Sequence, residues 1–385
     1  MRLAVGAVGT GLIALSCATG AASLKPQTCT TAVATQTDLP DVRTTETPLL
    51  GNPSDVVVSA DGRFSFISLS DGRIAVAATT ELAPRVSRVL RMPGRPTLNG
   101  LALTHDGRYL LAADGASGAI VLDVSRAETQ ETSAVVGALS APIHDGGAVM
   151  VATSADDALA FVALEKGNAI AVFDLSAAVV SGFKGTSFIG TIPVDTGPVG
   201  LALSPDGRWL YVTSELASPS ATHGTLSVID VGIAGTHPAG AVVGTAAAGC
   251  GPVRVAVSPD GGVIWVSARE SNAILAFSAE ALRDDPAHAL LATVPVGAAP
   301  IGLALVDGGR RVVVADSNRF RVPGSQSALS IVDAESALAG RPAAIGTVRS
   351  GDFPRGIAIM QDGRTVMIAN FNSKTLQTVD LTRLP

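Results

Sequence analysis

The sequence repeats one turn pattern seven times, and this repetition restricts the fold more than any other feature. In most copies an Asp-Gly pair separates two short apolar runs, as in the Ser-Pro-Asp-Gly-Arg turn within residues 197–231. Glycine accepts the positive φ of a tight turn, so each copy predicts a β-hairpin. The turns lie at residues 60–63, 105–108, 155–157, 205–208, 259–262, 307–310 and 361–364. They recur roughly every 45–55 residues, enough for four short strands per copy.

Each copy contains the apolar runs of four strands. In the fourth copy these are residues 201–204, 209–213, 226–230 and 241–246, and the third run ends in Asp, as in four other copies. The chain is 47% hydrophobic and only 16% charged, which is typical of many buried strands joined by tight turns. We therefore predict an all-β fold, a seven-bladed β-propeller with four antiparallel strands per blade.

The last copy lacks its fourth strand. Fourth runs follow the first six copies, at residues 86–92, 134–139, 188–194, 241–246, 291–296 and 344–348, whereas the seventh copy ends at residue 381 with its third run. Residues 45–50 match the fourth-strand pattern but have no blade before them. We expect this N-terminal strand to complete the last blade and close the ring, so that residues 45–385 form a single domain.

These copies resemble a known family. The segments TIPVDTGPVGLALSPDGRWLYVTSE, TVPVGAAPIGLALVDGGRRVVVAD and GDFPRGIAIMQDGRTVMIANFNSKTLQTVDL are similar to the YVTN-type β-propeller repeat of the lactonase-like seven-bladed propellers. The resemblance covers about residues 45–381, although blade one lacks the terminal Asp and blade three has Asp156-Asp157 in place of Asp-Gly. It implies the fold. Propellers of this kind include binding scaffolds, surface proteins and enzymes, so the function stays open.

The first 22 residues are typical of a signal peptide. Arg2 precedes an apolar stretch too short to span a bilayer, and small residues follow at 18–22. Alternatively, residues 14–17 form an imperfect lipobox that would anchor the chain to a membrane through Cys17. We expect a secreted or periplasmic protein. Residues 23–44 are polar and without hydrophobic period, which predicts a flexible arm.

Cys29 and Cys250 remain after removal of this leader. In an exported protein an even pair indicates a disulfide that joins the arm to the body, and the alternative is two free thiols. No CxxC, CxxCH, P-loop or dinucleotide fingerprint is present, so structural zinc, attached haem and nucleotide cofactors have no support. The net charge is −6 with no basic run, which disfavours nucleic acid as a partner. We expect a monomer.

Polar residues gather where a propeller places its channel mouth. The loops that enter the innermost strands and those that join second to third strands lie on one face. The predicted ligand-binding residues there are Asp55, Asn99, Asp114, Arg254, Arg269, Asp316, Arg319, Arg355 and Asn370. Asp114, Asp316 and Asn370 are candidate ligands of a hard divalent cation, which prefers oxygen. Alternatively, the carboxylates pair with the arginines or are solvated.

Candidates for proton transfer are few. His144 lies before the third innermost strand, and Glu165 and Glu215 follow second strands. A GxSxG nucleophile elbow and an HExxH zinc motif are absent from the sequence. Two loops, at residues 215–224 and 318–327, are longer than the corresponding loops of the other blades. Both join second to third strands, so both should rise over the face that carries the channel mouth.

Two functions fit these residues. The leading prediction is a binding or interaction module that takes a small molecule or a protein ligand at the channel mouth. The alternative, implied by the resemblance, is a lactonase-like hydrolase or isomerase that uses the mouth carboxylates. A divalent cation that polarises a carbonyl would assist that chemistry.

Overall fold

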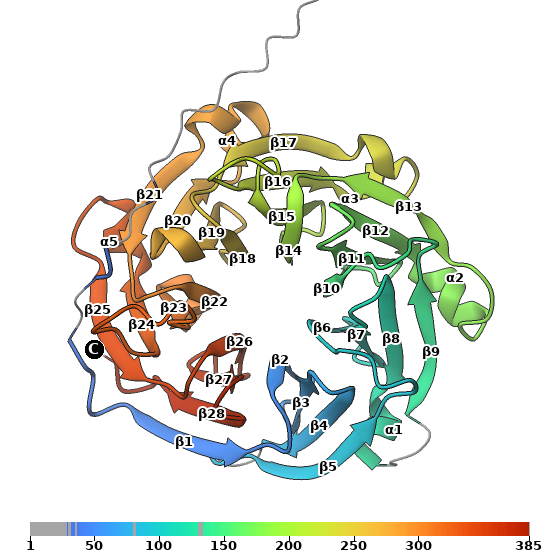
Figure 1. Cartoon of the computed structure of the whole chain (residues 1–385), viewed down its shortest axis with the longest axis horizontal. Coiled ribbons are helices and arrows are strands. Elements are labelled where there is room, and N and C mark those ends of the chain that lie inside the picture. Colours follow the sequence, from blue (N-terminus) through green and yellow to red (C-terminus); the bar gives the residue numbers. More distant parts are fainter. Residues whose placement is uncertain (1–28, 30–31, 35–36, 80–81, 130–133, 385) are drawn as a thin grey trace, which may run out of the picture.

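The computed structural model describes residues 29, 32–34, 37–79, 82–129 and 134–384. Seven four-stranded antiparallel sheets surround a central axis as the blades of a propeller (Figure 1). The fold predicted from the sequence is therefore confirmed. Residues 1–22, which were predicted as a signal peptide, lie outside the described residues.

The strands follow one another from the axis outward in each blade. Blade one has β2 (Pro53–Val58), β3 (Phe64–Leu69), β4 (Arg73–Ala78) and β5 (Arg85–Arg91); blade two has β6 (Leu101–Leu103), β7 (Tyr109–Ala113), β8 (Gly118–Asp123) and β9 (Val135–Ser140). Blade three has β10 (Ala148–Thr153), β11 (Leu159–Leu164), β12 (Ala169–Asp174) and β13 (Phe188–Pro193); blade four has β14 (Thr196–Leu203), β15 (Trp209–Leu216), β16 (Thr225–Asp230) and β17 (Val242–Ala247). Blade five has β18 (Pro252–Val257), β19 (Val263–Ala268), β20 (Ala273–Ser278) and β21 (Leu290–Pro295); blade six has β22 (Pro300–Val306), β23 (Arg311–Asp316), β24 (Ala328–Asp333) and β25 (Ala344–Arg349).

Blade seven joins the two ends of the chain. It consists of β26 (Pro354–Ile359), β27 (Thr365–Asn370), β28 (Thr375–Asp380) and the N-terminal strand β1 (Arg43–Pro48), which lies outside β28 (Figure 1). The two strands are antiparallel, and Thr47 pairs with Leu376. The Arg43 guanidinium forms an ion pair with the carboxylate of Asp380. The predicted closure is confirmed, with the strand starting two residues earlier than expected.

Hydrophobic side chains fill the space between adjacent blades. Seven clusters of buried residues each join two neighbouring blades, and the cluster around Leu111 and Val162, for example, lies between blades two and three. Short inner strands that are apolar on both faces therefore pack on both sides. This arrangement makes every blade depend on its two neighbours.

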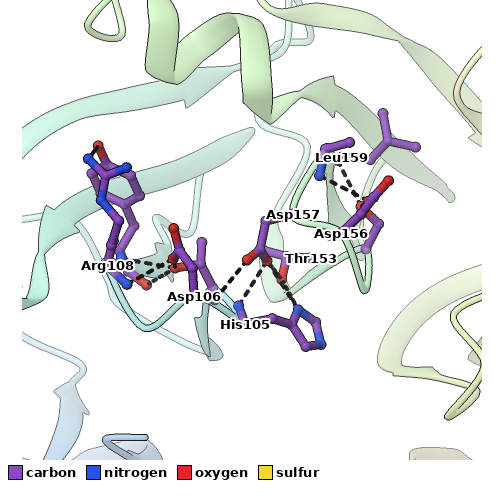
Figure 2. A network of polar contacts seen from close by, with 11 residues as sticks. His105, Asp106, Arg108, Thr153, Asp156, Asp157 and Leu159 are labelled. Atoms are coloured by element: carbon purple, nitrogen blue, oxygen red, sulfur yellow. Dashed lines mark hydrogen bonds and ion pairs between the residues drawn. The ribbon is translucent and has the colours of Figure 1, made fainter.

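The repeated turn is held by its own side chains. In blade four the Ser204 hydroxyl donates to Asp206 (2.5 Å) and accepts from the Trp209 amide (2.9 Å), while Gly207 takes a φ of +71°. Blade three places Asp157 at the glycine position with a φ of +55°. Its carboxylate accepts from the amides of His105 (2.9 Å) and Asp106 (3.0 Å) in the turn of blade two (Figure 2). The departure from Asp-Gly thus creates a polar contact between two blades.

Short helices follow most third strands and explain the recurrent terminal Asp. They are α1 (Val124–Thr129), α2 (Leu175–Val180), α3 (Val231–Ala234), α4 (Ala281–Asp284) and α5 (Ala334–Leu338), with single 3₁₀ turns η1 (Pro238–Gly240), η2 (Arg269–Ser271), η3 (Pro286–His288) and η4 (Asp307–Gly309). The Asp174 carboxylate accepts from the Ala177 amide (2.7 Å), and Asp230 and Asp333 cap α3 and α5 in the same way. These residues therefore serve the fold.

The described part of the N-terminal arm runs along blades five and six. Cys29 and Cys250 form a disulfide with Cα atoms 5.6 Å apart. Farther along, Asp38 makes a parallel bridge with Thr347 on β25, and the Leu39 side chain packs against the core between blades six and seven. No helix in the described residues is long and apolar enough to cross a membrane.

Candidate functional site: a cationic cavity at the channel mouth

A β-bulge at the start of the innermost strand aims side chains toward the propeller axis. The register of the first hairpin shifts there in six of the seven blades, for example between Pro198 and Gly200 in blade four. Bulges commonly re-aim a side chain next to a functional site. The bulged residues of blades three to six are Val149, Val199, Val253 and Ile301, and they pack together with Phe353 of blade seven. We call these five residues the axial cluster.

A cavity of about 100 Å³ lies above the axial cluster. Besides the axial cluster, it is lined by Glu165, Glu215, Arg254, Arg269, Arg319 and Arg355. We call this space the mouth cavity. Four guanidinium groups against two carboxylates give its lining a formal charge of +2, in a chain whose net charge is −6. The mouth cavity is therefore a local cationic site in an acidic protein.

Arg269 is held by carboxylates. It begins η2, and its Nη1 atom lies 2.9 Å from Glu215 Oε1, while Nη2 lies 3.5 Å from Glu270 Oε1. The Arg269 side chain is only 11% exposed, so this ion pair is largely shielded from water. The alternative in which mouth carboxylates pair with arginines therefore holds for Arg269 and Glu215.

Arg254 and Arg355 have no carboxylate within ion-pair distance among the described residues. Arg254 donates from Nη1 to the carbonyl of Val199 at 2.5 Å. Burial lowers the pKa of Arg254, against the opposing field of Asp55, Glu215 and Glu165. Burial and then the charge of Arg254 lower the pKa of Arg355 to about 10. A pKa of about 10 keeps the Arg355 guanidinium protonated at neutral pH.

Arginine and phenylalanine side chains alternate across this side of the mouth. The Arg355 guanidinium lies 5.7 Å from the ring centroid of Phe353 and 5.1 Å from that of Phe371. Arg319 lies in the same way over Phe353 (5.6 Å) and Phe320 (5.7 Å). Stacking on a ring fixes the plane of a guanidinium and leaves its N–H edge available for an anion.

Glu165 is the least compensated acid in the mouth cavity. Its carboxylate has no hydrogen-bond or ion-pair partner in the described chain, and Lys166 next to it pairs with Asp145 instead (2.9 Å). Burial, and then the negative charge of Glu215, raise the pKa of Glu165. A carboxyl group with a raised pKa in a cavity is a candidate for proton transfer.

Asp55 lies next to the mouth cavity without lining it. Its carboxylate accepts from the Leu101 amide (2.9 Å) of the following blade. Burial raises the pKa of Asp55, although the charges of Arg254 and Arg355 act in the opposite direction. Asp55 thus compensates these two arginines through the electric field rather than by contact.

The structure places several predicted site residues elsewhere. Asn99 donates to the carbonyl of Ala148 (3.0 Å), and Asp114 accepts from the amides of its own loop at residues 116 and 118. His144 is exposed beside the mouth and does not line the mouth cavity. Asp316 and Asn370 are fully buried at the ends of β23 and β27.

The positions of Asp316 and Asn370 have a simple cause. Asp316 pairs with Pro300 and Asn370 with Pro354, as Ser214 pairs with Pro198 in blade four. Asp316 and Asn370 therefore correspond to Ser214, whereas the position of Glu215, which lines the mouth cavity, comes one residue later. Because successive strand residues point to opposite faces of a sheet, Asp316 and Asn370 point into the blade. No group of three His, Cys, Asp or Glu in the described residues is arranged to hold a metal ion.

Sequence reasoning missed the apolar half of the site. The axial cluster contributes no charged group. Its Val and Ile residues stand at the start of an apolar run, after a proline or, for Val149, an alanine, and they look like ordinary strand residues. The available signal was the alignment of Val199, Val253 and Ile301 after Pro in three successive copies.

Comparison with known proteins agrees with this architecture. Among the solved structures, a chain of the hydrazine synthase of Kuenenia stuttgartiensis superposes with a TM-score of 0.70 at 19% identity, over 89% of this chain and 98% of that chain. This likeness shows the fold alone. No curated protein matches the sequence. The family model described as "Lactonase, 7-bladed beta-propeller" matches residues 101–322, which is more than half of the chain. The chain therefore belongs to the seven-bladed β-propeller lactonase family.

Proposed function

We propose that this propeller is a binding module whose mouth cavity takes a small organic anion. The observation that carries the proposal is the pair Arg254 and Arg355, two guanidinium groups beside the cavity without a carboxylate in ion-pair distance among the described residues. A charge that is withdrawn from water without a partner lowers the free energy of unfolding by several kcal/mol. A carboxylate or phosphate in the cavity would offset this cost, and it would match the planar N–H edge of arginine.

The stacked side chains support the same proposal. The rings of Phe353 and Phe371, whose centroids lie 5.5 Å apart, both contact the Arg355 guanidinium, so less rotamer freedom is lost when a ligand binds. The acids Glu165 and Glu215 keep the net charge of the lining at +2 rather than +4, which favours ligands of one or two negative charges.

Binding is tested by calorimetry with phosphate, sulfate, acetate, gluconate and benzoate at constant ionic strength. We expect at least one anion to bind, and Arg254→Gln and Arg355→Gln each to weaken it at least tenfold. Arg349→Gln is the matched control, because that side chain is 83% exposed and lies outside the mouth cavity. Absence of binding, or affinity that neither cavity variant changes, contradicts the proposal.

A second function, hydrolysis of a lactone, is favoured by Glu165 and by the family. Its free carboxylate, with a raised pKa, would take a proton from water as the water attacks the lactone carbonyl. The arginines would stabilise the oxyanion, and the ring C–O bond would then break as Glu165 returns its proton to the leaving oxygen. An isomerase would use the same acid for proton transfer.

Hydrolysis is tested by titrating the acid released from δ-valerolactone. We expect Glu165→Gln to lower the rate by about 10²-fold or more, while Arg349→Gln leaves it unchanged. A rate that Glu165→Gln does not alter would exclude this carboxylate as the base, without affecting the binding proposal.

We also propose that the protein is exported. The disulfide between Cys29 and Cys250 supports this location, because disulfides persist in oxidising compartments. Fractionation of cells, with detection of the oxidised form in the secreted or periplasmic fraction, tests it. A reduced protein found only in the cytoplasm would contradict it.

A further inference from the structure

The floor of the mouth cavity offers a ligand almost no hydrogen-bonding group. Val149, Val199, Val253, Ile301 and Phe353 contribute only carbon atoms from their side chains, and Val199, Val253 and Ile301 are each at least 94% buried. The floor spans five consecutive blades, and the charged groups complete the lining of the mouth cavity.

The backbone carbonyls of the floor are also occupied. Val199 O accepts from Arg254 Nη1 (2.5 Å), Val253 O from the Thr213 hydroxyl (2.9 Å) and Ile301 O from the Ser267 hydroxyl (2.6 Å). Val149 O accepts from the Gly100 amide (2.9 Å). A hydroxyl group of a ligand placed on this floor would lose its bonds to water without replacing them, which weakens binding.

We infer that the ligand is a small aromatic monocarboxylate, with its ring on the axial cluster and its carboxylate at the arginines. This inference rests on the proposed anion-binding function and names the chemical class of the anion. A polyhydroxylated acid of similar size would bury its hydroxyl groups against the Val and Ile side chains, so the site discriminates against it.

The size and walls of the cavity agree with an aromatic ring. A volume of about 100 Å³ has room for roughly eight water molecules, so only a small ligand fits. The flat guanidinium groups of Arg319 and Arg355 already stack on phenylalanine rings, with centroid distances between 5.1 and 5.7 Å. Phe353 of the axial cluster is the aromatic group of the lining against which a ligand ring would pack.

Calorimetry on the full chain with benzoate, gluconate and acetate tests this inference. Benzoate carries the ring, gluconate carries hydroxyl groups, and acetate carries the carboxylate alone. We expect benzoate to bind at least tenfold tighter than either of the other two. Gluconate or acetate binding as tightly as benzoate overturns the inference and leaves the anion-binding function intact. If no anion binds, both fall.

Variants of the floor provide an independent measurement. Val253→Thr and Val199→Thr keep the side-chain shape and add a hydroxyl group to the floor. We expect each to weaken benzoate three- to tenfold and to leave acetate affinity unchanged. Val243→Thr on the outer strand β17, where the side chain is 39% exposed, is the matched control. Unchanged benzoate affinity in both floor variants, with melting temperatures that show folded protein, overturns the inference. The wild-type ligand series decides the question if the floor variants do not fold.

Discussion

Asp316 is a buried acid whose charge lacks compensation. Its Oδ2 atom accepts from the Ser330 hydroxyl (2.5 Å), whereas Oδ1 has no partner in the described chain. Burial raises the pKa of Asp316 to about 7 from an ordinary value of 3.8. Between about pH 4 and pH 7 the folded state therefore keeps a proton that the unfolded state has released. The free energy of unfolding must fall as pH rises through this window.

Asp316→Asn should remove this pH dependence. Blade seven already has Asn370 at the equivalent position, where its amide donates to Thr375 and Gln377 (both 3.2 Å). We expect the variant to exceed the wild type in unfolding free energy by about 2–4 kcal/mol at pH 8 and to match it near pH 4. Urea denaturation at both pH values measures the difference.

The exposed Asp41 provides the control for this prediction, because Asp41→Asn should change stability by less than about 0.5 kcal/mol at either pH. An Asp316→Asn variant that is less stable than the wild type at pH 8 would show that the carboxylate is stabilised by an interaction that the protonated or amide form cannot make.

The same residue marks the limit of prediction from sequence at this scale. Polar residues at the ends of second strands were recognised, but whether Asp316 corresponds to Ser214 or to Glu215 depends on one position in the alignment of the copies. Because side chains alternate with a period of two, that single position decides between the channel mouth and the interior of a blade. The amino-acid sequence around Asp316 contains no signal that distinguishes a position at the channel mouth from one in the interior of a blade. The metal-ligand role proposed for Asp114, Asp316 and Asn370 stays a prediction.

At the scale of elements, the turn of blade three joins two blades through Asp157. Its carboxylate accepts from His105 N, Asp106 N and the Thr153 hydroxyl at 2.9–3.0 Å (Figure 2). Asp157→Gly restores the common turn residue and relieves about 1 kcal/mol of positive-φ strain. It also removes three charge-assisted bonds of about 1 kcal/mol or more each. We expect a net loss of about 1–2 kcal/mol in urea denaturation at pH 7.

Acid should abolish the difference between wild type and Asp157→Gly. Burial acts to raise the pKa of Asp157, but the bonds from His105 and Asp106 outweigh it and lower the pKa. The contribution of this carboxylate is thus present at neutral pH and is lost as pH falls through its folded pKa. His105→Ala is the control, because the ring is 55% exposed and the backbone amide remains. A Gly variant as stable as wild type would mean that the turn gains more from relaxed φ than from the contact.

Strands were predictable from the sequence, and helices and bulges were not. Apolar runs bounded by seven similar turns leave few alternatives to hairpins. The helices α1 to α5 have only four to six residues, too few to show a helical period, and only the terminal Asp indicated a cap. The bulge that turns Val199 and Val253 toward the axis is marked in the sequence only by the proline before each of them. The charged part of the candidate site was therefore predicted, and its apolar floor was not.

At the scale of the whole molecule, two N-terminal segments join distant parts of the ring. β1 closes blade seven, where the Thr45 and Thr47 hydroxyls donate to the carbonyls of Leu82 (2.6 Å) and Pro84 (2.7 Å) in blade one. The arm before it crosses blades five and six and is tied down by the disulfide at Cys250. Shortened chains separate the two contributions.

A chain that starts at residue 43 loses the arm but keeps β1, and one that starts at residue 52 loses both. Both short chains carry Cys250→Ser, because without Cys29 they would otherwise have a free thiol that the full protein lacks. We expect the first chain to melt a few degrees below the full protein. The second should melt at least about 10 °C lower still, because the loss of β1 leaves β28 as an unpaired edge and breaks the ring. Calorimetric melting and light scattering measure stability and edge-driven association. Equal melting of the two short chains would mean that β1 contributes little to closure and that neighbouring blades hold the ring without it.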